Sequence, residues 1–102
     1  MKKLIIAAAT IALAATIGTA VAGDAEAGKA KYAVCAGCHG PTGAGNEALK
    51  YPKLSGRDAA FVAEQLHAFK SGTRVNATMQ AMTAGLNEGD IDNLAAYIAT
   101  LQ

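Results

Sequence analysis

The stretch VCAGCHG, residues Val34 to Gly40, decides how this 102-residue chain is interpreted. It contains the pattern C-x-x-C-H, formed by Cys35, Cys38 and His39, and the chain has no other cysteine. Two cysteines at this spacing can form a disulfide, a dithiol redox site, part of a zinc site or the attachment point of a haem. The rest of the sequence favours one of these four.

The first three possibilities fit poorly. A Cys35–Cys38 bridge would close so short a loop that it would remove little entropy from the unfolded chain. A thioredoxin-like dithiol belongs with a βαβ pattern, and the sequence contains no convincing strand run. For zinc, the adjacent Cys38 and His39 are awkward ligands of one tetrahedron, and a second cysteine pair is missing.

Haem attachment fits both the pattern and the composition. The two thiols can add to the two vinyl groups at one porphyrin edge, while the next side chain, His39, points at the iron. The chain has no Trp, two Phe and three Tyr, so a large apolar cofactor would supplement a small core. We therefore predict one covalent haem c, bound through Cys35 and Cys38.

The N-terminal segment predicts export. Two lysines precede an apolar run from Leu4 to Ile17, and the small residues Ala20-Val21-Ala22 follow. The run is shorter than the ~20 residues of a membrane span. We expect residues 1–22 to be a signal peptide cleaved after Ala22, with a retained anchor as the alternative. Residues 23–102 would then form a single haem domain in the periplasm.

Charge excludes nucleic acid as a partner. The chain has nine Lys and Arg and eight Asp and Glu, and loss of Lys2 and Lys3 with the signal peptide leaves a net charge near −1. No basic stripe remains, and we expect no strong electrostatic steering. Four cations are candidates to offset the haem propionates: Lys50, Lys53, Arg57 and Arg74.

Capping residues and apolar spacing predict three main helices. Asp24 caps a first helix that ends in the haem motif. A second begins with the capping pattern Ser55 to Asp58 and stops at Gly72, and a third begins at Asn87 and runs to the C-terminus. The apolar stripes are Ala59, Val62, Leu66 and Phe69 in the second helix and Ile91, Leu94, Ile98 and Leu101 in the third.

The connections are expected to be less regular. A short helical turn is predicted around Glu47 to Tyr51, and Thr73 to Leu86 is expected to be irregular. Three side chains can supply a sixth iron ligand: His67, Met79 and Met82. His67 lies off the apolar stripe, so we expect it to face solvent. At least one of the two methionines is expected to ligate.

Four blocks of sequence resemble the class I c-type cytochromes, especially small single-haem bacterial carriers and the units of tandem-domain relatives. The blocks are GDAEAGKAKYAVCAGCHG, YPKLSG, EQLHAFKSGTR and NATMQAMTAGLNEGDIDNLAAYIATL, and the resemblance that rests on them covers the whole of residues 23–102. The resemblance implies the all-α class I cytochrome c fold, with three main helices and short turns wrapped around one covalent haem.

The resemblance also assigns roles to individual residues. It makes Cys35 and Cys38 the thioether ligands of the macrocycle and His39 the proximal iron ligand. The methionine ligand is expected at Met79, with Met82 as runner-up, and the Pro52 carbonyl is expected to accept the ring N–H of the histidine.

Two further expectations follow from this family. In this family the first and last helices pack across each other at a small residue and aromatic rings, which would place Gly28 and Tyr32 against Leu94 and Tyr97.

Because His/Met ligation leaves no vacant iron position, we expect a one-electron carrier between larger redox proteins and not an enzyme. The alternative is a gas-binding protein or weak peroxidase with a labile methionine. The mature form is expected not to span a membrane and to be a monomer or weak dimer.

Overall fold

The computed structural model describes residues 23–102, and the predicted signal peptide over residues 1–22 lies outside them. The helices are α1 (Ala25–His39), α2 (Ala59–Ser71), α3 (Ala77–Ala84) and α4 (Glu88–Ile98), with a short 3-10 helix, η1 (Glu47–Leu49). The described residues form no strand beyond one isolated bridge, Asn46 to Tyr51. The all-α prediction is confirmed. Among the helices of this part of the chain, none has the length and apolar character needed to cross a bilayer.

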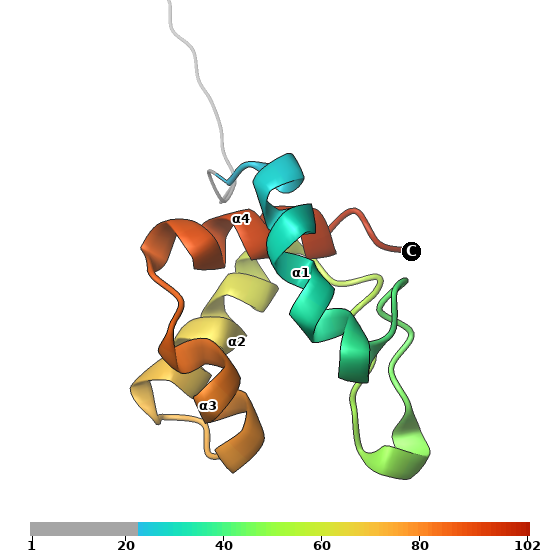
Figure 1. The fold of residues 1–102 in the computed structure, drawn as a ribbon, viewed down its shortest axis with the longest axis vertical. Helices are drawn as coiled ribbons and strands as arrows, with labels where there is room; N and C mark the ends of the chain where they lie inside the picture. The colour runs from blue at the N-terminus through green and yellow to red at the C-terminus, as the bar shows by residue number, and fades with distance from the viewer. Residues whose placement is uncertain (1–22) are drawn as a thin grey trace, which may run out of the picture.

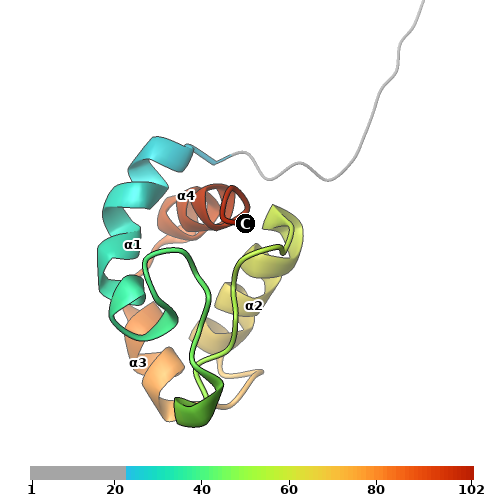
Figure 2. The same ribbon diagram turned by 90° about the vertical axis from the view of Figure 1, so that its right-hand side faces the viewer.

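The helices enclose one core. α4 packs against both α1 and α2, and α2 packs against α3. Figure 2 shows α1 and α2 on opposite sides of the domain, with α4 between them at one end and α3 at the opposite end. The loop that connects α1 to α2 runs between these two helices. The core combines residues of α1, α2 and α4: Tyr32, Val62, Ala63, Leu66, Ile91, Leu94, Ala95 and Ile98.

The crossing of α1 and α4, visible in Figure 1, depends on a glycine. A Cβ at Gly28 would lie 1.9 Å from the carbonyl oxygen of Asn93, so only glycine lets the two backbones approach this closely. One turn further along α1, the ring of Tyr32 lies 5.3 Å from that of Tyr97, and Tyr32 and Leu94 share the core. The predicted packing of the first helix against the last is confirmed.

The hydroxyl of Tyr32 joins this crossing to the haem motif. The side chain is only 3% exposed, and its O–H donates a 2.7 Å hydrogen bond to the carbonyl oxygen of Gly40, the residue after His39. Burial raises the pKa of the Tyr32 phenol to about 12, with the neighbouring Cys35 and Tyr97 as smaller contributors. The neutral phenol is therefore the form that the fold stabilises.

Replacing Tyr32 by phenylalanine is expected to lower the free energy of unfolding by about 1 kcal/mol, because the half-buried Gly40 carbonyl loses one of its two donors and keeps only the N–H of Gly43, at 3.1 Å. The folded pKa of about 12 exceeds the value of about 10 in the unfolded chain, so wild-type stability should fall as the pH rises from 10 toward 12. This fall should be smaller in Tyr32→Phe. Urea unfolding at pH 7, 10 and 11.5 measures both effects; equal alkaline losses in the two proteins would contradict the assignment.

The predicted start of the second helix was wrong by three residues. The N-cap of α2 is Asp58, whose carboxylate accepts a 2.8 Å hydrogen bond from the N–H of Phe61. Ser55 does not cap the helix; it is buried, and its N–H donates to the Gly43 carbonyl. Gly56 has a φ of 82°, in the left-handed region, so the chain cannot be helical between Ser55 and Asp58.

The prediction that Thr73 to Leu86 is irregular was also wrong, because α3 forms within it. Asn76 caps this helix by accepting from the N–H of Met79 at 2.9 Å. At its other end the Lys70 ammonium, from α2, donates to the Ala84 carbonyl at 3.2 Å. An eight-residue helix is marginal alone, so these caps and the packing on α2 stabilise it.

The last helix begins as predicted and ends earlier. Asn87 and Asp90 form a reciprocal capping box at the start of α4. The helix ends at Ile98, and Leu101 packs against the core from the turn that follows. The short helical turn predicted around Glu47 is confirmed as η1.

Candidate haem site

The last turns of α1 present the C-x-x-C-H residues together. Asp24 caps the helix by accepting from the N–H groups of Glu26 and Ala27, and the helix continues unbroken to His39. The next residue, Gly40, has φ 90° and ψ 154°, a conformation that essentially only glycine adopts. The chain therefore leaves α1 directly after His39, and the loop that follows turns back toward this histidine.

The imidazole of His39 is held from the returning loop. Its Nδ1–H donates to the Pro52 carbonyl oxygen at 2.9 Å, since a carbonyl can only accept, and the side chain is 7% exposed. The contact expected for Pro52 is present. The neutral ring then has Nε2 as its unprotonated nitrogen, which is the form that binds a metal. The N–H of Gly45 donates to the His39 carbonyl at 2.8 Å and keeps the loop folded back.

A cavity of about 860 Å³ lies beside this histidine, lined by Cys35, Cys38, His39 and Met79. This volume lies in the upper part of the ~300–1,000 Å³ range of ligand and cofactor pockets. Much of its apolar wall comes from the loop before α2 and from α2 and α4, with Leu54, Val62, Leu66, Phe69, Leu94 and Ile98 among its residues. The thiols and the imidazole thus face an apolar space.

Exposed apolar side chains surround the same cavity. Five large hydrophobic residues are exposed in the described part of the chain, and all five line the cavity: Val34, Leu49, Phe61, Val75 and Met82. Contiguous exposed apolar surface on a soluble domain marks a binding site. A planar apolar macrocycle with two points of thiol attachment and an iron centre fits this lining and this donor set.

Both candidate methionines line the cavity from α3, where positions 79 and 82 share a face. Met79 is half-buried and packs against the core, whereas Met82 is 42% exposed. The backbone of Met79 is fixed at both ends: its N–H donates to Asn76, and its carbonyl accepts from the buried hydroxyl of Thr83 at 2.8 Å. Of the two, Met79 is the more buried.

His67, the third candidate ligand, does not line the cavity. Its side chain is 41% exposed and faces Glu88 of α4, in agreement with the prediction of a solvent-facing histidine. The four side chains predicted as candidates to offset the haem propionates, by contrast, all line the cavity: Lys50, Lys53, Arg57 and Arg74.

One cavity-wall contact could not be found from the sequence. The guanidinium of Arg74 lies 4.6 Å from the ring centroid of Phe69 and donates to the amide oxygen of Gln65. Gln65 and Arg74 are nine residues apart, on either side of the turn that ends α2, so no helical periodicity connects them. Gln65 was not among the candidate site residues.

The surroundings of Cys35 differ from those of a reactive dithiol. Neither cysteine forms a disulfide, and burial raises the pKa of the Cys35 thiol, with the charge of Cys38 adding to the effect. Reactive dithiol motifs usually have a lowered thiol pKa. The shift at Cys35 has the opposite direction.

Comparison with known proteins identifies the family. Residues 23–98 match the family described as "Cytochrome C oxidase, cbb3-type, subunit III". The chain belongs to this family of class I c-type cytochrome domains. As such a domain it binds covalent haem c, for which C-x-x-C-H is the attachment pattern.

Individual relatives agree with this assignment. Cytochrome c-554(547) of Halothiobacillus neapolitanus is 44% identical over 93 residues, which cover 79% of this chain and 100% of the relative. Cytochrome c4 of Pseudomonas aeruginosa is 40% identical over 79 residues, 78% of this chain and 39% of the relative. The chain spans 34–47% of the length of three cytochrome c4 relatives.

A solved structure confirms the fold. The reduced recombinant cytochrome c4 of Pseudomonas stutzeri superposes with a TM-score of 0.73 at 35% identity, over 76% of this chain and 48% of that one. The predicted class I cytochrome c fold is therefore confirmed.

Proposed function

We propose that this chain is a periplasmic one-electron carrier whose haem c is bound through Cys35 and Cys38, with His39 and Met79 as the iron ligands. The observation that carries the proposal is that both cysteines, the fixed imidazole and Met79 line one apolar cavity. When bound, the haem supplies reversible one-electron iron redox chemistry.

The protein holds and orients the cofactor. Cys35 and Cys38 lie three residues apart near the end of α1, so both thioethers would attach the macrocycle to a single rigid element. The Pro52 carbonyl fixes the ring of His39 and its tautomer, which keeps Nε2 available as a ligand. Apolar residues of α2 and α4 exclude water from this side of the cavity.

The choice between electron transfer and substrate chemistry rests on α3. Asn76 and Thr83 fix the backbone of Met79, which favours a thioether ligand that stays in place. If His39 and Met79 both hold the iron, a gas or peroxide would have no site at the metal. A thioether ligand also raises the reduction potential relative to a second imidazole.

Larger redox proteins are the proposed partners. One relative bears the name "Thiosulfate dehydrogenase electron acceptor", which supports a role in accepting electrons from an enzyme. The exposed apolar side chains Val34 and Met82 lie where the cavity reaches the surface. A small and transient contact around this edge would suit electron transfer.

The test is the visible spectrum of the purified protein, reduced, before and after carbon monoxide. We expect sharp low-spin haem bands that the gas does not change. A gas-induced shift would instead assign the protein to ligand binding through a labile methionine. Absence of haem bands would refute the proposal outright.

A further inference from the structure

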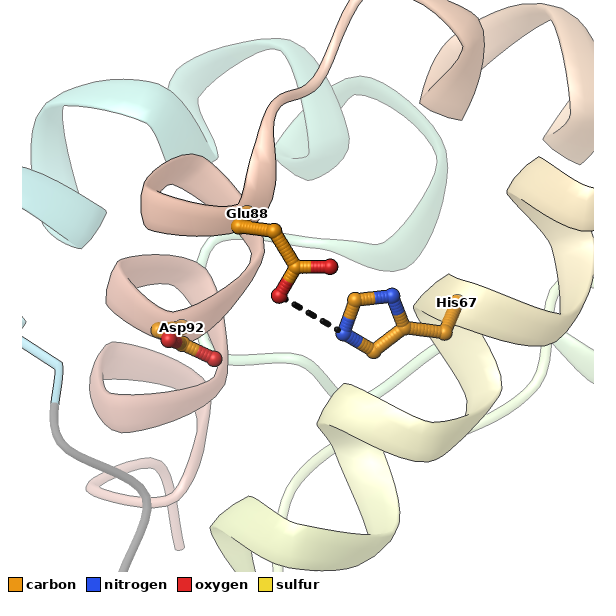
Figure 3. Close-up of side chains that lie close together, drawn as sticks. All are labelled: His67, Glu88 and Asp92. Atoms are coloured by element: carbon orange, nitrogen blue, oxygen red, sulfur yellow. Dashed lines mark ion pairs between the residues drawn. The ribbon is translucent and has the colours of Figure 1, made fainter.

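A second group of metal-ligating side chains lies outside the haem cavity. His67 of α2 and Glu88 and Asp92 of α4 bring one nitrogen and two carboxylate oxygens within 4.8 Å of one another. Figure 3 shows the imidazole of His67 directed across the gap between the helices toward Glu88, with Asp92 one turn along α4. None of the three lines the haem cavity.

The spacing of the donors suits coordination better than hydrogen bonding. The Nε2 atom of His67 lies 3.6 Å from Oε1 of Glu88, too long for a hydrogen bond. Two ligands of a tetrahedral zinc ion, each bonded at about 2.1 Å, stand about 3.4 Å apart. This separation is within ion-pair distance, and it is also close to the one that an ion between the two donors requires. The Asp92 carboxylate lies within 4.8 Å of both donors.

The charges of the cluster also favour a cation. Glu88 and Asp92 stand four residues apart on one face of α4, an arrangement in which like charges destabilise a helix. Within residues 23–102, no lysine or arginine forms an ion pair with either carboxylate; Lys31 pairs with Asp90 instead. The histidine comes from a different helix, so an ion here would connect α2 to α4.

We propose that His67, Glu88 and Asp92 form a binding site for a divalent transition-metal ion of the zinc type. Imidazole combined with carboxylates is a donor set that zinc accepts, and three protein ligands leave the fourth tetrahedral position to water. The His67 and Glu88 side chains are 41% and 81% exposed, so an ion can enter directly from solvent. The bound ion cross-links the two helices that form one wall of the core.

The experiment is an isothermal calorimetry titration of the untagged, haem-loaded protein with zinc chloride. We expect saturable binding of one ion per chain. His67→Gln and Asp92→Asn should each weaken binding more than about tenfold, since even residues that only orient a metal ligand contribute 10–100-fold. Glu64→Gln changes an exposed carboxylate of α2 outside the cluster and should leave binding unchanged.

Thermal unfolding supplies an independent readout. Saturating zinc should raise the Tm of the wild type and of Glu64→Gln by about 4 °C or more, and should not raise that of His67→Gln. The haem spectrum should stay the same throughout, because the site does not touch the cavity. The proposal is overturned if zinc does not bind saturably, or if His67→Gln binds it as the wild type does, which would place the ion elsewhere.

Discussion

Replacing Met79 by alanine is expected to convert the protein from an electron carrier into a ligand-binding haem protein. Alanine has no donor atom, and no other residue of α3 occupies the same fixed position beside the core. We expect the reduced variant to bind carbon monoxide, which the wild type should not. The reduction potential should fall on the order of 100 mV or more, within the ~0.8 V range that axial ligands span. Visible spectra with carbon monoxide and a redox titration measure the two effects.

Met82→Ala is the matched control, because Met82 lies on the same face of α3 and lines the same cavity. Its side chain is 42% exposed, so its removal should leave the spectrum and the carbon monoxide response as in the wild type. If the reduced Met82→Ala protein binds carbon monoxide and the reduced Met79→Ala protein does not, Met82 is the iron ligand and our assignment of Met79 is wrong.

Gly28→Ala is expected to be the most damaging single-methyl change in the fold. The added Cβ would lie 1.9 Å from the Asn93 carbonyl oxygen and 2.9 Å from Cβ of Tyr97, and backbone atoms of α4 cannot rotate away. α1 and α4 would have to separate, which opens the core around Leu94. We expect a loss of at least about 3 kcal/mol, a large part of the ~5–15 kcal/mol stability of a small domain. Urea unfolding followed by far-UV circular dichroism measures it.

Gly89→Ala is the control for helix propensity. Gly89 lies in the first turn of α4, and a Cβ there meets only the Asn87 side chain, at 3.4 Å. Alanine is favoured over glycine in a helix, so this variant should be unchanged or more stable by up to ~1 kcal/mol. A Gly28→Ala protein as stable as Gly89→Ala would show that the helices do not cross as closely as the structure has them.

The local chemistry of the sequence was enough to predict the cofactor and the main helices. C-x-x-C-H places two thiols and an imidazole within five consecutive residues, so their proximity is a property of one helical turn and not of the fold. The caps at Asp24 and Asn87 act within three residues of themselves, which is why both helix starts were predicted correctly. The resemblance to a known family then added Pro52, Met79 and the α1–α4 crossing.

Features that depend on residues distant in sequence were decided by the tertiary structure alone. α3 was missed because its C-terminal cap is Lys70, on another helix, and because so short a helix forms only when packed on α2. The cavity exists because α1, the returning loop and α2–α4 surround a common space. The group of His67 with Glu88 and Asp92 has no sequence signature at all, since 21 positions separate His67 from Glu88.

The physical reason for this division is the range of the interactions involved. Capping hydrogen bonds, helix periodicity and the thiol spacing act over a few residues, so the sequence by itself determined the haem motif and where α1 and α4 begin. The hydrogen bond from His39 to Pro52 and the crossing of α1 and α4 were expected only from the family resemblance, whereas α3 and the surface cluster came from the tertiary structure alone. All of these depend on how whole helices pack, through contacts such as Gly28 against Asn93, 65 residues apart, which local sequence patterns do not contain.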